Sequence, residues 1–361
     1  MIENSIISDH FTVEELKKLK ITPPDAKMYK KIRSNWDSVA KPLDGMGDFE
    51  LLTAKIGAVL GDENIDISKK AVIIMCADNG VVEEGVTQCG QEVTATVAEN
   101  FLDEKSCVAI MCRRAGTKIC PVDIGMAVDT PRVEKRKIAY GTKNMAKEPA
   151  MTREQAVAAI EVGIAKAEEL HAQGYEMLAT GEMGIGNTTT SSAMTAVYLG
   201  LDVETVTGRG AGLSSHGLQR KIHAIKQAIA VNQPDPEDPL DVLAKVGGLD
   251  IAGMCGLFLG GAAQQMPVIM DGFISQVAAL TAMRLVPECA DYILASHVSE
   301  EPGANILLKA LEKDAFLTCG MRLGEGSGAV ALFPILDFAS DIYHKMSTFV
   351  QADIVEYQPL D

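Results

Sequence analysis

The chain has no apolar run long enough to cross a lipid bilayer. Hydrophobic residues make up 47% of its 361 residues, but a charge or a glycine interrupts every run before ~18 residues. Segment 1–19 is mixed and charged, and it lacks the basic start and apolar middle of a secretory signal. We therefore expect a globular, cytoplasmic protein with no membrane partner.

Patterns of metal ligands and of familiar nucleophiles are also missing. The eight cysteines form no C-x2-C pair, so reduced thiols explain them better than disulfides or zinc ligands. None of the six histidines has a metal-binding spacing, and no G-x-S-x-G element or cysteine nucleophile signature is present. The sequence therefore predicts no metal site, and we expect no cofactor.

A net charge of −16 argues against nucleic acid as a partner, because most of the surface would repel a phosphate backbone. A small anionic substrate would need local compensation from basic residues. Basic side chains near glycine-rich loops are therefore of particular interest.

Short, nearly continuous apolar runs alternate with helical patterns. Strands are expected at residues 71–77, 118–124, 176–180, 266–270 and 291–296, and helices at 92–115, 152–173, 188–200, 214–231, 249–264 and 272–285. This alternation predicts a doubly wound α/β fold with a mainly parallel sheet.

The two ends of the chain have a different pattern. Residues 12–19, 25–38 and 333–352 are predicted to be helical. We expect residues 1–45 and 337–361 to form a small helical subdomain beside an α/β catalytic domain of residues 46–336.

Polar or glycine-rich loops follow four of the predicted strands, beginning at Asp78, Gly181, Asp271 and Ser296. Ligands of such sheets bind beyond the carboxyl ends of the strands. The convergence of four such loops predicts a binding site at this edge.

The second loop has the glycine spacing of a phosphate-binding turn, from Gly181 to Gly186, but Asn187 replaces the lysine that reaches the outer phosphates of a triphosphate. Backbone N–H groups at a helix N-terminus can still bind one phosphate. The pattern therefore favours a nucleotide-like ligand with a single phosphate, although a tight turn capped by Asn187 would look the same.

Two carboxylates are candidates for chemistry or recognition. Glu325 lies between Gly324 and Gly326, where a closed loop would desolvate the carboxylate and raise its pKa towards that of a general base. Glu182 lies within the phosphate-type turn, and its side chain could point towards a base or a ribose hydroxyl. Either residue could instead be a solvated loop glutamate.

Other side chains could complete such a site. Arg209 and Lys221 could neutralise a phosphate, and Gln88 and Gln91 could hydrogen-bond a heterocycle edge. A lysine on a helix is more often solvated than bound to a ligand. A structural role is likewise the better interpretation of His297.

Six segments together resemble the nicotinate-nucleotide:dimethylbenzimidazole phosphoribosyltransferase family. They follow the order of the family's motifs and span about residues 44–352. The segments are 76–94 (CADNGVVEEGVTQCGQEVT), 181–189 (GEMGIGNTT), 208–213 (GRGAGL), 271–275 (DGFIS), 295–297 (ASH) with 301–303 (EPG), and 320–328 (GMRLGEGSG).

The resemblance implies transfer of phosphoribose from nicotinate mononucleotide to a cobamide lower-ligand base, which yields an α-ribazole phosphate-type nucleotide and nicotinate. Glu325 matches the family's catalytic glutamate, which would deprotonate the base nitrogen as that atom attacks C1′ with inversion. The substrate site would comprise Asp78, Gln88, Gln91, Glu182, Gly184, Ile185, Gly186, Asn187, Thr188, Arg209, Lys221, Asp271, Gly272, Ser299 and Leu323. The resemblance also implies a homodimer, or a heterodimer with a paralogue.

The chain departs from the family pattern in the loop expected to bind the base. Asn79 replaces a common histidine, and Cys89–Gly90 replaces an aromatic residue and a proline. A different benzimidazole, a purine or a phenol could therefore be the acceptor. Two other hypotheses are a phosphorylase or hydrolase of a nucleotide glycosidic bond, and a subunit of a hetero-oligomer with little activity alone.

Overall fold

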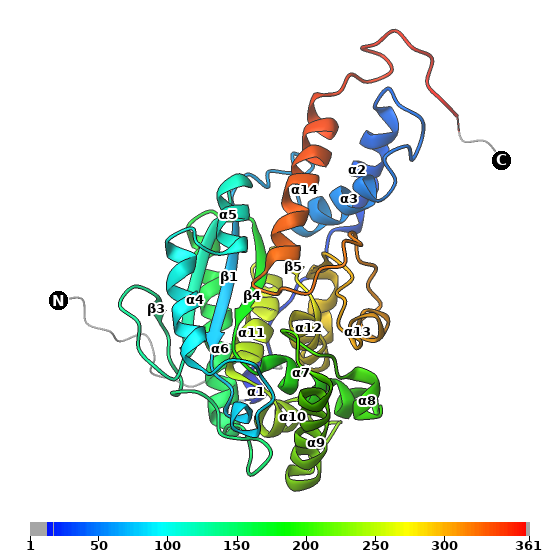
Figure 1. Cartoon of the computed structure of the whole chain (residues 1–361). Coiled ribbons are helices and arrows are strands. Elements are labelled where there is room, and N and C mark those ends of the chain that lie inside the picture. Colours follow the sequence, from blue (N-terminus) through cyan, green and yellow to red (C-terminus); the bar gives the residue numbers. More distant parts are fainter. Residues whose placement is uncertain (1–12, 17, 359–361) are drawn as a thin grey trace.

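A six-stranded sheet forms the centre of the computed structural model, which describes residues 13–16 and 18–358 (Figure 1). The strand order is β3-β2-β1-β4-β5-β6, and every neighbouring pair is parallel. The strands are β1 (Lys70–Ala77), β2 (Lys118–Gly125), β3 (Glu134–Lys135), β4 (Met177–Met183), β5 (Val268–Met270) and β6 (Ile293–Ala295). The predicted α/β fold with a parallel sheet is confirmed, although the short strand β3 was not predicted.

The central strand β1 explains why the sheet is covered on both faces. All of its residues are buried, and successive side chains alternate between the two faces. Ile73 and Met75 belong to one hydrophobic core, whereas Val72 and Ile74 belong to the other. A strand of this kind needs helices on both sides, so the fold is doubly wound.

Helices form the two outer layers. The first core contains side chains of α6 (Arg153–Ala172) and α11 (Leu249–Ala263), and the second contains those of α4 (Glu92–Leu102), α5 (Cys107–Arg114) and α14 (Ser327–Lys345). The other described α-helices are α1 (Val13–Leu16), α2 (Ala26–Ser38), α3 (Asp48–Leu60), α7 (Asn187–Leu199), α8 (Val203–Val206), α9 (Ser215–Asn232), α10 (Pro239–Val246), α12 (Phe273–Leu285) and α13 (Ala304–Ala310). None of the helices in the described residues has both the length and the apolar character that a bilayer span requires.

Glycines allow α6 and α11 to pack backbone against backbone. A Cβ atom added at Gly256 would lie 1.9 Å from the carbonyl oxygen of Ile160, and one at Gly163 would lie 2.1 Å from that of Gly253. No larger residue fits at these positions without moving the helices apart. This close packing fixes α11 beside the sheet and so fixes the position of Asp250 in its first turn.

The prediction of one helix over 92–115 is wrong. Helix α4 ends at Leu102, and α5 begins after Ser106, whose side chain accepts a hydrogen bond from the N–H of Ala109. Serine favours a helix N-cap over a helix interior, because its oxygen satisfies an unpaired backbone donor. Glu104, with a φ of 54°, lies in the turn between the two helices.

Other boundaries also differ from the prediction. Helix α14 begins six residues earlier than expected and ends at Lys345, and it tolerates Pro334 within its length. Helices α3, α8, α10 and α13 were not predicted. Of the helix expected at 12–19, α1 covers Val13–Leu16, and Thr12 and Lys17 lie outside the described residues. Lys18 and Leu19 are not helical, so the expected end of this helix is wrong.

Near the two ends of the chain, α2, α3 and α14 lie together at one end of the molecule (Figure 1). Trp36 of α2 contacts Tyr343 of α14, with ring centroids 5.4 Å apart. Buried Glu50 of α3 pairs with Lys41 at 2.6 Å and with Arg33 at 3.0 Å. The domain boundaries expected after residue 45 and before residue 337 stay a prediction.

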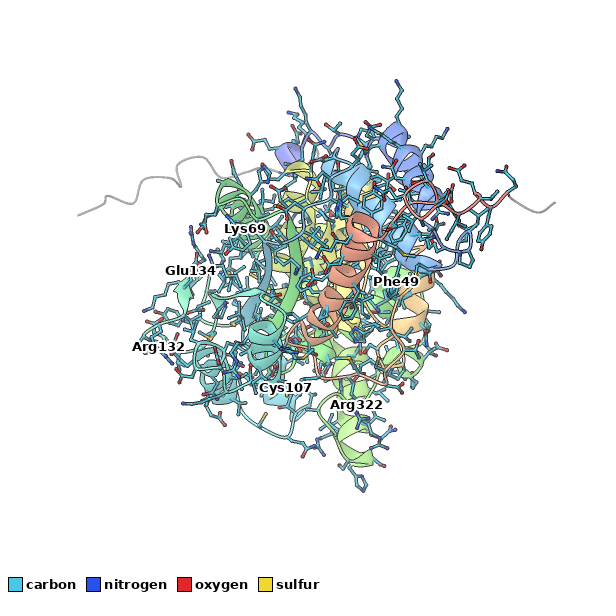
Figure 2. The ribbon with its side chains drawn as sticks, turned by 90° about the horizontal axis from the view of Figure 1, so that it is seen from above. Phe49, Lys69, Cys107, Arg132, Glu134 and Arg322 are labelled. Carbon is cyan, nitrogen blue, oxygen red and sulfur yellow. The ribbon has the colours of Figure 1, made fainter. Side chains whose placement is uncertain are left out.

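The edge strand β3 and helix α3 lie far apart in the molecule. Figure 2 places Glu134 of the edge strand β3 and Phe49 of α3 on opposite sides of the molecule. Phe49 contacts Phe316, with centroids 5.8 Å apart, and therefore joins α3 to the segment that follows α13.

Candidate active site

A cavity of about 300 Å³ lies beyond the carboxyl ends of the strands. Strands β2 and β3 lie on one side of β1, whereas β4, β5 and β6 lie on the other, so the strand order reverses between β1 and β4. Ligands of open α/β sheets bind at such a point. The loops that follow β4, β5 and β6 all contribute to the walls. The predicted site residues that line the cavity are Gln88, Glu182, Gly184, Ile185, Gly186, Asn187, Thr188, Arg209, Asp271, Gly272, Ser299, Leu323 and Glu325.

The turn after β4 delivers the N-terminus of α7 to the cavity. Gly186 has a φ of 96°, which permits a sharp entry into the helix at Asn187. A Cβ at Gly184 would lie 2.5 Å from the carbonyl oxygen of Ala77, so only glycine allows this turn to approach β1 so closely. The N–H groups of Asn187 and Thr189 donate to carbonyls within the turn, at 3.1 and 2.9 Å. The N–H groups of Gly186 and Thr188 are therefore the candidates to face an anion.

Lys221 of α9 lies behind this turn and is completely buried. Its Nζ donates hydrogen bonds to the Thr188 hydroxyl at 2.8 Å and to the Gly208 carbonyl at 3.2 Å. Burial lowers the pKa of Lys221 to about 8, although the nearby Glu301 carboxylate opposes that shift. Lys221 does not itself line the cavity, but it places a positive charge one side chain away from it.

A buried polar cluster connects the turn to α11. The Asn187 amide donates one hydrogen bond to Glu182 and another, at 2.9 Å, to Asp250. Burial and the neighbouring Asp250 raise the pKa of Glu182 to about 8, and burial raises the pKa of Asp250 to about 6. This raised pKa favours the protonated form of Glu182, which reduces the negative charge of the site.

Sequence reasoning missed Asp250. A single carboxylate at the start of an otherwise apolar helix was the available signal, since burying an unpaired charge is costly.

Glu325 lies in a turn with unusual backbone geometry. Gly324, Glu325 and Gly326 have φ values of 87°, 62° and 85°, all in the left-handed region. The Glu325 N–H donates to the Glu182 carboxylate at 3.3 Å. The Glu325 carboxylate accepts a 3.5 Å hydrogen bond from Val108 N–H in the first turn of α5, and burial raises its pKa.

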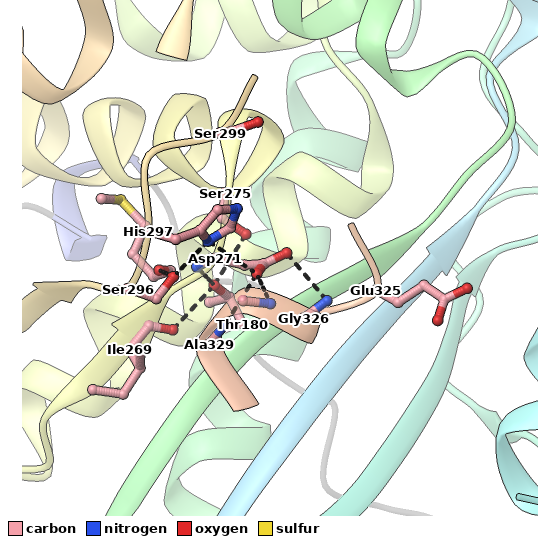
Figure 3. A network of polar contacts seen from close by, with 12 residues as sticks. Thr180, Ile269, Asp271, Ser275, Ser296, His297, Ser299, Glu325, Gly326 and Ala329 are labelled. Carbon is pink, nitrogen blue, oxygen red and sulfur yellow. Dashed lines mark hydrogen bonds and ion pairs between the residues drawn. The ribbon is translucent and has the colours of Figure 1, made fainter. Parts of the chain in front are cut away.

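Asp271 follows β5 and also contacts this turn. Its carboxylate accepts hydrogen bonds from the N–H groups of Gly326, Gly328 and Ala329, at 3.2, 2.8 and 3.1 Å (Figure 3). Only 3% of Asp271 is exposed, so its side chain faces the start of α14.

Asp78 and Gln91 were predicted for the substrate site, but neither lines the cavity. The buried Asp78 carboxylate accepts from the Thr94 hydroxyl at 2.6 Å and from Ala127 N–H at 2.8 Å. The Gln91 amide donates to the Asn79 carbonyl at 3.2 Å. Both side chains shape the loops around the cavity.

Gln88 and Arg209 line the cavity while joining loops. The Gln88 amide donates to the Ala211 carbonyl at 3.2 Å, which connects the loop after β1 to the glycine-rich loop before α9. The Arg209 guanidinium donates to the Leu213 carbonyl at 2.7 Å. Cys89 also lines the cavity, where a small side chain leaves room for a ligand.

The described residues contain no group of three or more histidine, cysteine or acidic side chains arranged to hold a metal ion. The donors and acceptors around the cavity are carboxylates, amides, hydroxyls and backbone N–H groups, which suit an organic ligand with an anionic group.

Comparisons with known proteins agree with this arrangement. Residues 21–354 match the model of a family described as phosphoribosyltransferase. A nicotinate-nucleotide–dimethylbenzimidazole phosphoribosyltransferase of Ruminiclostridium cellulolyticum is 47% identical over 92% of this chain and 95% of its own length. The protein of the same name from Acetivibrio thermocellus is 48% identical over 91% of this chain and 94% of its length. The crystal structure of CobT from Thermus thermophilus superposes with a TM-score of 0.87 at 36% identity, covering 92% of this chain and all of that one.

Proposed function

Because the chain belongs to the nicotinate-nucleotide:dimethylbenzimidazole phosphoribosyltransferase family, we propose that it transfers phosphoribose from nicotinate mononucleotide to 5,6-dimethylbenzimidazole or a related aromatic acceptor. The products are an α-ribazole 5′-phosphate-type nucleotide and nicotinate. The observation that carries this proposal is the shared cavity, in which Glu325 and the Gly184–Thr188 turn line the same space.

The nucleotide phosphate binds at the N-terminus of α7. Backbone N–H groups of this turn and the Thr188 hydroxyl supply donors, and Lys221 supplies the positive charge from 2.8 Å behind Thr188. A dianionic phosphate so close would favour the protonated lysine and reverse the effect of burial on its pKa. Arg209 adds a second positive charge at the cavity wall.

Glu325 acts as the general base. The azole nitrogen attacks C1′ of the ribose, the bond from C1′ to the nicotinate nitrogen breaks, and the azole proton passes to the Glu325 carboxylate. Nicotinate leaves without an acid because its nitrogen already bears a positive charge in the substrate. Burial raises the pKa of Glu325 and so strengthens it as a base.

Glu182 favours substrate binding through its neutral charge and its position. A neutral Glu182 does not repel the substrate's phosphate and carboxylate groups, and its position in the cavity wall lets it contact a ribose hydroxyl. Gly272, Ser299 and Leu323 contact the substrates from the other walls. The acceptor ring lies against Gln88 and Cys89, where the small cysteine accommodates acceptors of differing shape.

We extend the proposal to assembly and compartment. Exposed apolar side chains on α14 and after it, including Phe338, Val350 and Val355, support a homodimer, or a heterodimer with a paralogue. Eight free cysteines support a reducing cytoplasm. Light scattering of the purified chain, alone and mixed with the paralogous protein, measures the mass of the assembly and so tests this proposal.

The central experiment incubates the purified chain with nicotinate mononucleotide and one acceptor at a time, chosen from azoles, purines and phenols. Mass spectrometry identifies each product. We expect a nucleotide of the acceptor and an equal amount of nicotinate, with the highest turnover for a benzimidazole.

Controls distinguish the other hypotheses. Ribose 5-phosphate released without any acceptor would identify a hydrolase, and ribose 1,5-bisphosphate formed with inorganic phosphate would identify a phosphorylase. If the chain alone forms no product under any condition, the proposed activity of the chain by itself is wrong.

A further inference from the structure

The turn that carries Glu325 has a backbone that must be held in place. Its three residues Gly324, Glu325 and Gly326 are all left-handed, and Glu325 is a non-glycine residue in that region. Such conformations persist when the surrounding contacts enforce them. The contacts that enforce this turn therefore decide where the proposed base lies.

Asp271 binds the last residue of this turn and the start of the helix that follows it. One carboxylate oxygen accepts from Gly328 N–H at 2.8 Å and Ala329 N–H at 3.1 Å, and the other accepts from Gly326 N–H at 3.2 Å. A buried carboxylate that binds three backbone donors is a strong anchor for the start of α14. Figure 3 shows this network, with the Glu325 side chain pointing away from it.

Neighbouring side chains hold Asp271 in its turn. The Ser296 hydroxyl donates its proton to the Met270 carbonyl at 2.7 Å, so the 3.0 Å contact with His297 requires a proton on His297 Nδ1. That nitrogen also lies 3.8 Å from the Asp271 carboxylate. A Cβ at Gly328 would lie 2.0 Å from the same nitrogen, so glycine lets the imidazole ring pack on the start of α14.

We propose that Asp271 is a positioning residue, whose carboxylate holds the Gly324–Gly326 turn so that Glu325 reaches the acceptor. This role rests on the proposed transferase function, but the contact can be tested without it. In this role Asp271 acts through the backbone of the turn.

The test compares Asp271→Asn with the wild type. Asparagine keeps the shape and one acceptor oxygen, but its NH₂ group faces a backbone donor and the charge is lost. Hydrogen exchange measured by mass spectrometry on peptides covering residues 320–330 should become at least roughly tenfold faster. The kcat should fall roughly 10- to 100-fold because the base is displaced.

Two further readouts separate positioning from a general loss of stability. The Kd for nicotinate mononucleotide should change less than about twofold, because the phosphate turn follows β4 and not β5. The acid limb of the kcat–pH profile should move to lower pH, since a displaced Glu325 is better solvated and the Asp271 charge, which helps to raise the pKa of Glu325, is removed.

Asp123→Asn is the matched control. Asp123 is also a completely buried carboxylate near a strand end, and it accepts a backbone hydrogen bond from Met126 N–H at 2.9 Å and pairs with Lys137 at 3.2 Å. It does not contact the turn. Its variant should leave exchange at 320–330 and the pH profile unchanged.

Unchanged exchange at 320–330 in Asp271→Asn would overturn the proposed contact. Faster exchange with unchanged kcat in an active enzyme would overturn the positioning role. A wild type that forms no product would refute the transferase function, while the exchange comparison would still decide whether Asp271 holds the turn. Asp271→Ser provides the same comparison if the asparagine variant does not fold.

Discussion

Replacing Lys221 by methionine should weaken nucleotide binding without weakening the fold. Methionine retains the length of the buried side chain but removes the charge. Burial lowers the pKa of Lys221 from 10.5 to about 8, which corresponds to about 3 kcal/mol of unfavourable free energy for the charged form in the empty site. The two hydrogen bonds of Nζ recover about 1 kcal/mol each. Removing both effects should leave the free energy of unfolding at pH 7 unchanged or raised by about 1 kcal/mol.

Binding should respond in the opposite direction. A positive charge one hydroxyl group behind the phosphate contributes about 1.5–3 kcal/mol at the effective dielectric constant of a protein interior, so Lys221→Met should raise the Kd for nicotinate mononucleotide by roughly 10- to 150-fold. Titration calorimetry measures the Kd, and urea denaturation without ligand measures stability. Lys226→Met is the control, because Lys226 lies on the same helix but is exposed and pairs with Glu204.

The pH dependence gives an independent check. A lysine whose folded-state pKa is lowered binds fewer protons in the folded than in the unfolded state between pH 8 and 10.5. This group's contribution to the unfolding free energy of the wild type therefore rises as pH increases through that window, and the methionine variant lacks it. An unchanged Kd, or a loss of about 2 kcal/mol or more in stability at pH 7, would refute this account of Lys221.

Three other substitutions test separate parts of the structure. Glu325→Gln should keep nicotinate mononucleotide binding but lower kcat by at least roughly 100-fold, and near-normal turnover would remove the residue from the base role. Asp250→Asn should lower the pKa of Glu182, which the Asp250 carboxylate helps to raise. A raised carboxyl pKa makes stability fall as pH rises from about 4.5 to about 8, so urea denaturation at pH 6 and 8 should show a smaller difference for the variant than for the wild type. Gly256→Ala should lower the free energy of unfolding by about 1–3 kcal/mol or more, because its Cβ would lie 1.9 Å from the Ile160 carbonyl oxygen, and an unchanged denaturation midpoint would contradict the backbone packing of α6 and α11.

The central strands could be predicted because their sequences fit only one environment, the centre of a sheet that is buried on both faces. The run at 71–77 is apolar at every position, and β1 is buried over Lys70–Ala77. Strand ends in a parallel sheet then lie at one edge by geometry, which is why loops distant in the sequence converge on one cavity. The edge strand β3 has only two residues, which is too short for a periodic signal.

Details of the site depended on contacts that no local pattern encodes. The sequence identified Glu182 and Glu325 as candidates, but it did not indicate that the Glu325 N–H donates to the Glu182 carboxylate. Asp250 joins the site only because α11 packs against α6 through glycines. Asp271 was predicted for the substrate site from a motif, whereas its three backbone partners follow α13 and lie over fifty residues away in the sequence.

At position 325, thermal stability and catalytic turnover favour different residues. A left-handed backbone costs a non-glycine residue about 1–2 kcal/mol, of which glycine would return part after its own entropy loss of roughly 0.5–1 kcal/mol. Replacing Glu325 by glycine should therefore raise the melting temperature of the protein. The same replacement would remove the proposed general base. Screens of this protein for heat resistance alone would thus enrich for inactive variants at Glu325, and such screens need an activity filter.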